Sequence, residues 1–394
     1  MIRTFTYRFF PSKIQESVLA QTLSLCCQLY NAAIEQRRHA AKSNRHITYR
    51  LQQDQLPELK RGLPEFRLVH SQVLQDVLRR VDRAYASFFD RLDRKRNGEH
   101  IRPGCPRFKP PCRYNSITYP QAQRFQIIEG HVVLPKIGKL RVFMHRDPVG
   151  DIKTMTVKRD SVGDWYIFLT VDIPDIPLKA PKTAIGVDLG VTKLVQLTTG
   201  EFVEHPRFLR KSEEKLRRAQ RQLSRKVKGS RNREKVRIRI AKIHRKIRRQ
   251  REDLLHKVSR ELVSSADLLV FEDLPIANML RNEVLAKSIH DASWGKLLRY
   301  ASYKASSAGK RVIRVDPRGT TCDCACGEEV RLSVSDRIFS CPRCGLTIDR
   351  DLHGAFGTLR KVGWEAAEFT PVEIKPLLVA RPASSVVETG SPKQ

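Results

Sequence analysis

Residues 184–197 read AIGVDLGVTKLVQL, and this stretch decides the fold of the second half of the chain. Its first part, Ala184 to Val187, is a short apolar run typical of a buried strand, and Asp188 follows it. Gly190 then permits a tight turn, and Lys193 to Leu197 forms a second strand-like run. The stretch therefore predicts a β-hairpin with a carboxylate at the end of its first strand.

Two more buried strands are expected further along the chain. Asp267 to Phe271, which is apolar after its first residue, is followed by Glu272, and Val312 to Val315 forms the last of the four strands. A helix is predicted from about Ser293 to Ala308, and a second short helix from Asp349 to Lys361. Strands that alternate with helices in this way indicate an α/β domain.

Three acidic residues, Asp188, Glu272 and Asp351, occur where these strands end or in the loops beside them. Carboxylates repel a phosphodiester unless divalent cations lie between them. Two Mg²⁺ or Mn²⁺ ions about 4 Å apart would activate a water on one side and stabilise the leaving oxygen on the other. Asp273 and Asp349 are neighbouring alternatives that the pattern leaves open.

The glycine turn at residues 186–190 has a rival interpretation. Sugar-kinase and actin-like ATPases also place an acidic residue beside glycine on a turn between strands. Such enzymes need a second glycine-rich phosphate hairpin downstream, and the sequence contains none.

The charge of the chain points to a polyanionic partner. Its 394 residues contain 74 Lys and Arg against 42 Asp and Glu, a formal net charge of +32. The excess is greatest between residues 207 and 260, where 23 basic residues face 5 acidic ones. Two apolar stripes separated by Gly229 and Ser230 predict an antiparallel helical hairpin there. A solvated charge run is the alternative, but nucleic-acid contact is favoured. The candidate contacts are Arg217, Arg218, Arg221, Arg225, Lys242, Arg245 and Lys246.

No membrane partner is expected. The most apolar stretch, Val18 to Ile34, is interrupted by Gln21, Gln28 and Asn31, and no signal peptide is visible. The expected location is the cytoplasm of a prokaryote, in association with the nucleoid, and the expected state is a monomer.

Five of the nine cysteines crowd into residues 322–344, which is the spacing of a metal site and not of a disulfide framework. Cys341 and Cys344 form a C-x-x-C turn followed by Gly345, typical of half a zinc ribbon. Cys326 likewise precedes a glycine and is the expected third ligand. The fourth ligand is Cys322 or Cys324, and the longer spacing favours Cys322. Four thiolates predict a structural Zn²⁺, with unmetallated cysteines as the alternative.

The first half of the chain has a different pattern. Ile2 to Phe9 reads as one strand, and helices are expected from Ser12 and from about Ser71. Glycine and proline mark a boundary between Gly98 and Tyr119, and Pro174 to Pro181 reads as a linker. Short β-rich runs between these boundaries predict an antiparallel sheet or barrel that the opening strand joins: Phe125 to Ile128, His131 to Leu134, Leu140 to Met144, Ile152 to Lys158 and Trp165 to Asp172.

Taken in order, these motifs resemble the TnpB family of transposon-encoded RNA-guided DNA endonucleases, which is related to compact type V CRISPR effectors. The resemblance covers nearly the whole chain. Besides the basic hairpin, it rests on Tyr7-Arg8-Phe9-Phe10-Pro11, Pro106-Arg107-Phe108-Lys109, Gly186-Val187-Asp188-Leu189-Gly190, Phe271-Glu272-Asp273-Leu274, Arg318-Gly319-Thr320-Thr321 and Asp349-Arg350-Asp351. The chain departs from the family at His353, where Asn is usual, and at the first cysteine pair, which is one residue short.

The resemblance implies a multidomain α+β protein: a wedge β-barrel with an inserted helical recognition lobe, then an RNase H-like RuvC nuclease domain with an inserted zinc ribbon. The corresponding segments are 1–10 for the wedge strand, 11–110 for the recognition lobe, 111–180 for the barrel, 181–318 for RuvC with its basic hairpin at 207–262, 319–346 for the ribbon, 347–363 for the end of RuvC, and 364–394 for a disordered tail.

The resemblance also implies an activity. A guide RNA from the transposon end would pair with double-stranded target DNA beside a short adjacent motif, and RuvC would cut both strands. Asp188, Glu272 and Asp351 are then the catalytic carboxylates, and Gln72, Gln75 and Thr118 are candidates for contacts with the adjacent motif. The alternatives are an RNA-guided repressor without cleavage, which would usually have lost one of the three acids, and a transposase acting directly on transposon ends.

Overall fold

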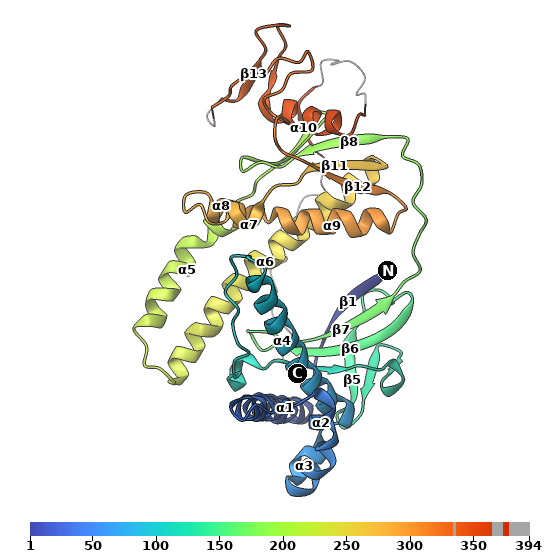
Figure 1. The fold of residues 1–394 in the computed structure, drawn as a ribbon, viewed down its shortest axis with the longest axis vertical. Helices are drawn as coiled ribbons and strands as arrows, with labels where there is room; N and C mark the ends of the chain where they lie inside the picture. Colours follow the sequence, from blue (N-terminus) through green and yellow to red (C-terminus); the bar gives the residue numbers. More distant parts are fainter. Residues whose placement is uncertain (334–335, 365–372, 378–394) are drawn as a thin grey trace, which may run out of the picture. The chain divides into compact units, whose positions relative to one another are not determined.

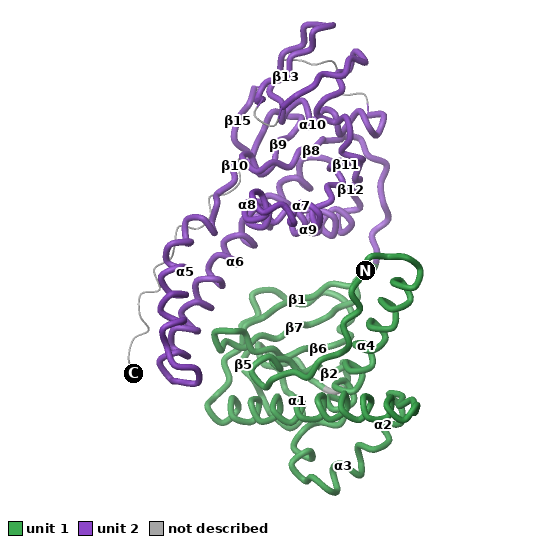
Figure 2. Tube along the Cα trace, turned by 60° about the vertical axis from the view of Figure 1, so that its left-hand side comes forward, with its two compact units in different colours: residues 1–174 green, residues 175–394 purple. Residues whose placement is uncertain are grey.

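The computed structural model describes residues 1–333, 336–364 and 373–377, and the chain divides into two compact units between Pro174 and Asp175 (Figure 2). This boundary falls at the start of the predicted linker. None of the helices in the described residues has the length and hydropathy that a membrane span requires.

A seven-stranded antiparallel sheet forms the centre of unit 1, with the strand order β2-β6-β7-β1-β5-β4-β3. The first strand lies in the middle of this sheet and pairs with β7 along its whole length and with β5 at its end, which confirms the prediction for the opening strand. The short strand β2 was not predicted. The bounds are β1 (Ile2–Phe9), β2 (Ser116–Tyr119), β3 (Gln126–Ile128), β4 (His131–Leu134), β5 (Gly138–Phe143), β6 (Asp151–Arg159) and β7 (Trp165–Asp172).

Helices fill the long connection between β1 and β2. Ser12 caps α1 through a reciprocal capping box with Gln15, and the apolar residues of α4 from Val73 to Val81 are buried, whereas Phe89 further along the helix is 50% exposed. One hydrophobic cluster joins these helices to the sheet, so the segments predicted as recognition lobe and barrel share a core. The bounds are α1 (Lys13–Lys42), α2 (Tyr49–Asp54), α3 (Leu56–Gly62) and α4 (Ser71–Arg96), with 3₁₀ turns η1 (Pro64–Leu68), η2 (Pro111–Arg113) and η3 (Ala122–Arg124).

Unit 2 is built on a six-stranded mixed sheet with the order β12-β11-β8-β9-β10-β15, and all six strands are labelled in Figure 2. The predicted hairpin is β8 and β9, which pair antiparallel, and β11 runs parallel to both β8 and β12. Apolar side chains from β8, β9 and β11 form the centre of its core. The bounds are β8 (Ala184–Asp188), β9 (Lys193–Leu197), β10 (Glu201–Glu204), β11 (Leu268–Glu272), β12 (Arg311–Val315) and β15 (Lys375–Pro376).

The predicted basic hairpin consists of α5 and α6, which lie side by side and are joined by a short turn that contains Gly229 (Figure 1). The turn glycine has φ of +85°, a conformation that other residues rarely adopt. The helices of unit 2 are α5 (Phe208–Ser224), α6 (Arg231–Ser265), α7 (Ile276–Met279), α8 (Ala286–Ala292), α9 (Trp294–Ser306) and α10 (Arg350–Lys361).

A two-stranded hairpin separates β12 from α10. It consists of β13 (Ile338–Ser340) and β14 (Thr347–Asp349), and β14 continues directly into α10. We call residues 319–349 the ribbon segment.

The tail was predicted to be disordered throughout. That prediction is wrong for β15, whose two residues pair in parallel with β10 at Glu201 and Phe202. The sequence pattern did not predict strand β10. The edge of the sheet to which β15 adds was therefore not predicted either. Residues 365–372 and 378–394 lie outside the described residues.

Candidate catalytic and metal sites

Asp188 and Glu272 occupy matching positions on two neighbouring strands. Val187 of β8 is the register partner of Phe271 of β11 in a parallel pair, so the next residue on each strand is an acid. Side chains on one strand alternate between the two faces of a sheet, and adjacent strands are about 4.8 Å apart. The two carboxylates therefore leave the same edge of the sheet on the same face.

Helix α10 carries the third acid across that face. The backbone of β8 and α10 approach so closely at Gly186 that a Cβ there would lie 2.1 Å from the carbonyl oxygen of Ala355. Asp351 lies one helical turn before Ala355. A Cβ built on Gly354 would lie 3.5 Å from the Cγ of Asp188, which is an ordinary van der Waals contact. Gly186 thus lets the helix bring Asp351 to Asp188, and a side chain at position 354 would fit without a clash.

The neighbouring acids that the sequence left open have other partners. The Asp349 carboxylate caps α10 by accepting the backbone N–H groups of Asp351 at 3.0 Å and Leu352 at 3.1 Å, and Lys193 pairs with it at 3.1 Å. The side chain of Asp273 is 64% exposed and lies 3.6 Å from Arg314. Asp349 therefore orients the helix that carries Asp351, and Asp273 faces solvent.

Electrostatic repulsion couples the three predicted catalytic acids. Removal of the Asp188 carboxyl from water raises its pKa well above the usual range, and the charges of Glu272 and Asp351 raise it further. Burial raises the pKa of Glu272, and a hydrogen bond from Thr320 opposes that shift. Glu272 is buried, Asp188 and Asp351 are half-buried, and carboxylates that repel one another in this way favour protons or divalent cations as partners.

The three acids bring carboxylate oxygens from two neighbouring strands and one helix to the same site. A two-metal site places two ions about 4 Å apart among such oxygen ligands. The residues present fit such a pair, because all three offer the hard oxygen donors that Mg²⁺ and Mn²⁺ prefer.

Four cysteine sulfurs converge in the ribbon segment: those of Cys324, Cys326, Cys341 and Cys344. The Sγ atoms of Cys324 and Cys344 are 3.6 Å apart, as are those of Cys326 and Cys341. Four sulfurs about 2.3 Å from a tetrahedral Zn²⁺ lie roughly 3.8 Å from one another, so the group has the dimensions of a zinc site.

The choice of Cys322 as the fourth ligand is corrected to Cys324. Asp323 bridges to Glu329, and the turn between them contains Gly327, with φ of +88°. The backbone N–H of Gly327 donates to the carbonyl of Cys324 at 3.1 Å, so Cys324 opens the turn that also contains Cys326, and Cys322 precedes this turn. The tight turn, which the sequence spacing did not reveal, places Cys324 and not Cys322 beside the other sulfurs.

Electrostatics distinguish two of the four thiols. Burial raises the pKa of Cys324 to about 12, whereas backbone N–H groups of Cys344 and Arg343 lower the pKa of Cys341 to about 7. The C-x-x-C turn therefore stabilises a thiolate before any ion binds. Burial disfavours the Cys324 thiolate. Part of the free energy of metal binding is therefore used to deprotonate this thiol.

The predicted nucleic-acid contacts of the basic hairpin are mostly accessible. Arg245 is half-buried, and the other six candidates are exposed: Arg217, Arg218 and Arg221 on α5, Arg225 directly after it, and Lys242 and Lys246 on α6. Arg218 pairs with Glu214. Most of the hairpin's positive charge thus faces solvent, where it can meet phosphate groups.

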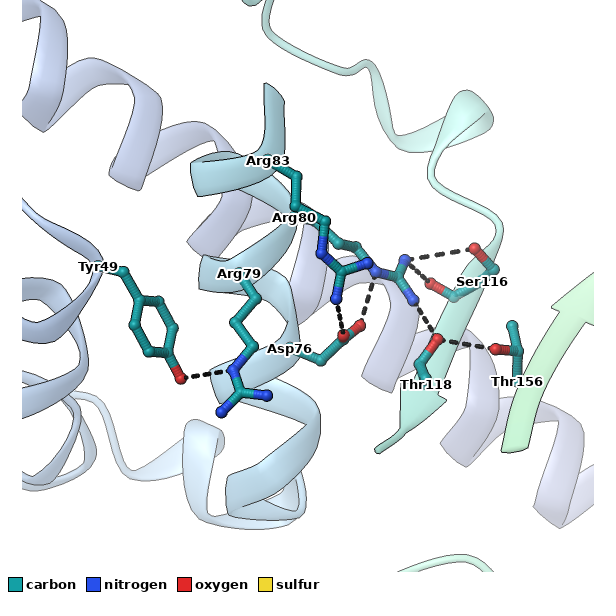
Figure 3. A network of polar contacts seen from close by, with 8 residues as sticks. All are labelled: Tyr49, Asp76, Arg79, Arg80, Arg83, Ser116, Thr118 and Thr156. Atoms are coloured by element: carbon teal, nitrogen blue, oxygen red, sulfur yellow. Dashed lines mark hydrogen bonds and ion pairs between the residues drawn. The ribbon is translucent and has the colours of Figure 1, made fainter. Parts of the chain in front are cut away.

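Thr118, one of the three candidate contacts in unit 1, takes part in a polar network between α4 and β2 (Figure 3). Arg80 donates hydrogen bonds to Asp76 at 2.7 Å, to the carbonyl of Ser116 at 2.8 Å and to the hydroxyl of Thr118 at 2.7 Å. The Thr118 hydroxyl also contacts that of Thr156 at 2.8 Å. Thr118 is therefore partly committed within the fold, and Arg80, which sequence reasoning missed, connects the helix to the sheet.

Gln72 and Gln75 are half-buried on the same helix, and Gln72 donates to Gln121. Arg79 donates to the Tyr49 hydroxyl at 3.1 Å, and the side chain of Arg83 is 72% exposed. The face that these residues form presents guanidinium and amide groups together.

Comparison with known proteins places three family models on the chain. A family described as "Probable transposase" matches residues 168–283, "Cas12f1-like, TNB domain" matches residues 294–357, and "Helix-turn-helix domain" matches residues 1–46. The second of these covers the ribbon segment and most of α10.

Two curated relatives are similar over most of their length. A "Putative RNA-guided DNA endonuclease" of Streptomyces pristinaespiralis is 32% identical over 362 residues, which cover 90% of this chain and 87% of the relative. The "Putative RNA-guided DNA endonuclease InsQ" of Escherichia coli K12 is 32% identical over 377 residues and 90% of each chain.

One solved structure has the same fold. The chain aligns with a protein chain from the "Cryo-EM structure of the Cas12f1-sgRNA-target DNA complex" with a TM-score of 0.57 and 12% identity, over 91% of this chain and 98% of that one. The similarity extends across both units and establishes the multidomain α+β architecture.

Proposed function

Because the chain belongs to the TnpB family of RNA-guided DNA endonucleases, we propose that it cuts double-stranded DNA beside a short transposon-adjacent motif, directed by a guide RNA from the transposon end. The observation that carries this proposal is the convergence of three acids in a strongly basic chain: Asp188 and Glu272 end neighbouring strands, and a Cβ on Gly354, in the helix that carries Asp351, would lie 3.5 Å from the Cγ of Asp188. All three acids are present, which favours a cleaving enzyme over a binding protein without cleavage.

The nuclease domain is proposed to be an RNase H-like RuvC domain. Strands β8, β9 and β10 are antiparallel, β11 is the parallel partner of β8, and β12 is the parallel partner of β11, an order that supports the assignment. Asp188 and Glu272 are the last residues of the neighbouring strands β8 and β11, and Asp351 lies in the first turn of a helix that packs on β8.

The carboxylates are proposed to hold two Mg²⁺ or Mn²⁺ ions. When bound, such ions activate a water and stabilise the leaving oxygen of the phosphodiester. The chain's own contribution is positional: strands β8 and β11 fix two carboxylates side by side, and the Asp349 cap holds the first turn of α10. Because ionised acids repel one another, the charges of Glu272 and Asp351 help to keep Asp188 protonated when no metal ion is bound.

The basic hairpin α5–α6 is proposed to contact guide RNA and target DNA through its exposed arginine and lysine side chains. In unit 1, the α4–β2 face is proposed to recognise the adjacent motif through Gln72, Gln75 and Thr118, with Arg80 holding Thr118 in place. The sulfur spacing supports a structural Zn²⁺ at Cys324, Cys326, Cys341 and Cys344.

Expression with flanking transposon DNA tests the proposal. We expect one structured RNA to copurify with the protein, and the complex to linearise a plasmid that carries a matched site in Mg²⁺ but not in excess chelator. Copurification of unrelated cellular RNAs without one dominant species would contradict guidance by RNA. Binding of a matched site without cleavage in any divalent metal would instead favour the repressor.

A further inference from the structure

Thr320 lies between the ribbon segment and the carboxylate site. The residue is 1% exposed, and its Oγ1 donates to the Oε1 of Glu272 at 2.5 Å. The carbonyl of Pro317 is a second acceptor, at 2.8 Å. A hydroxyl has one proton to donate, and an ionised carboxylate is the stronger acceptor. The hydrogen bond therefore fixes one oxygen of Glu272 and leaves the other for a metal ion.

The segment that carries Thr320, residues 320–323, is held along one face of α10; we call it the strap. The Nδ1 of His353 lies 3.1 Å from the carbonyl of Thr321, and Arg360 donates to the carbonyl of Asp323 at 2.6 Å. Gly357 lies between His353 and Arg360 on α10, and a Cβ built on it would lie only 2.0 Å from the carbonyl oxygen of Thr320. Positions 353, 357 and 360 share one face of a helix. The strap thus lies directly against the helix that carries Asp351.

The far end of the strap enters the cysteine group at Cys324. On the other side of that group, Cys341 and Cys344 lead through β14 into α10. The ring of Phe339 on β13 stacks on His353, with centroids 3.6 Å apart and an interplanar angle of 9°, and both residues are fully buried. An ion bound to the four sulfurs would therefore link two chain segments. One is the strap, which contains the Thr320–Glu272 hydrogen bond, and the other is β14, which leads into the helix that carries Asp351.

We propose that Thr320 is a positioning residue for Glu272, and that occupancy of the cysteine site fixes the strap and so sets the affinity of the carboxylate site for divalent cations. The inference deepens the proposed function and rests on it for the identity of the carboxylate site. The alternative is that the Thr320 hydrogen bond only satisfies a buried carboxylate and has no effect on metal binding.

The test measures Mn²⁺ binding to the full-length protein by electron paramagnetic resonance, without nucleic acid and without a cleavage assay. Thr320→Val keeps the shape of the side chain but removes the donor, and Thr320→Ser restores a hydroxyl. Thr358→Val is the matched control, because this buried hydroxyl on α10 contacts the carbonyl groups of Ala355 and Val270 and no carboxylate.

We expect Thr320→Val to weaken Mn²⁺ binding about tenfold, the effect of losing one hydrogen bond to a charged group. Thr320→Ser and Thr358→Val should stay within about twofold of the wild type. Equal Mn²⁺ affinity in the Thr320→Val and wild-type proteins would overturn the positioning role.

The connection to the cysteine site is tested with Cys344→Ser, alone and combined with Thr320→Val. If the cysteine site acts through the strap, Cys344→Ser weakens Mn²⁺ binding by itself and adds little in the double variant. The connection would be overturned if Cys344→Ser left Mn²⁺ affinity unchanged, or if the fold-changes of the two single variants multiplied in the double variant. Circular dichroism checks that each variant is folded. If the Thr320 effect is present but no guide-dependent cleavage is found, the positioning role stands and the proposed function fails.

Discussion

Gly186 and Ala355 are in direct backbone contact: a Cβ at position 186 would lie 2.1 Å from the carbonyl oxygen of Ala355. This contact sets the height of α10 above β8 and therefore the distance from Asp351 to Asp188. A glycine at 186 is required by space, since no other residue has a side chain that fits against a backbone atom.

The first prediction compares two glycines that face the same interface. Gly186→Ala should destabilise the protein by about 3 kcal/mol, because the clash is with backbone and α10 must move. Gly354→Ala, whose Cβ would meet Asp188 at 3.5 Å, should leave stability unchanged or raise it by up to about 1 kcal/mol, since Ala favours helix. Urea unfolding measures both, and equal stability of the two variants would show that the helix is not held at Gly186.

The second prediction concerns pH. Asp188 has a pKa raised well above its usual range in the metal-free fold, so the folded state binds its proton more tightly than the unfolded chain does. Its contribution to stability is full below the unfolded pKa of about 4 and is lost as pH rises through the raised value.

The check is a comparison of unfolding free energy against pH, in chelator, for the wild type and Asp188→Asn. The wild type should lose stability relative to the variant as pH rises above about 4, and saturating Mg²⁺ should remove the difference by replacing the proton. Parallel curves for the two proteins would mean that the Asp188 carboxyl is not held in a repulsive, water-poor site.

The third prediction concerns zinc. Cys324→Ser should lower the zinc content well below one ion per chain, because it removes one of the four converging sulfurs. Cys322→Ser is the matched control and should retain one ion. Elemental analysis of the purified proteins gives both values, and loss of zinc from the Cys322 variant alone would restore the assignment made from sequence spacing.

The fourth prediction concerns the stack of His353 on Phe339. His353→Ala should increase hydrogen exchange in β13 and β14, because the ribbon segment loses its ring contact with α10. His256, which stacks on Tyr300 with centroids 4.1 Å apart, offers a control in the same unit: His256→Ala should leave exchange in β13 and β14 unchanged. Unchanged exchange in both variants would show that the ribbon segment is held without this contact.

Much of the site could be predicted from sequence because its acids follow apolar runs. Asp188 and Glu272 each end a strand that is recognisable by itself, and Asp351 follows a motif near the start of a helix. The pairing of β8 with β11 was not visible, since 79 intervening residues separate Asp188 from the start of β11 and register is a tertiary property.

Two features could not be foreseen for physical reasons. The fourth cysteine depends on a tight turn at Gly327, and four residues of spacing suit several turn geometries equally. Thr320 belongs to the Arg318-Gly319-Thr320-Thr321 motif, but the sequence does not reveal its partner, and its role follows from a strap that lies on α10 through the close contact at Gly357. Only the folded chain brings Glu272 to it.

The most direct test of the central claim is plasmid cleavage by Asp188→Ala in complex with its copurified guide RNA, beside Asp273→Ala as the control. Asp273 is a neighbouring acid with a side chain 64% exposed, so its removal changes charge without touching the proposed site. We predict that Asp188→Ala binds matched DNA with wild-type affinity but does not cut it, while Asp273→Ala cuts normally. Cleavage by Asp188→Ala at a rate near that of the wild type would contradict the account.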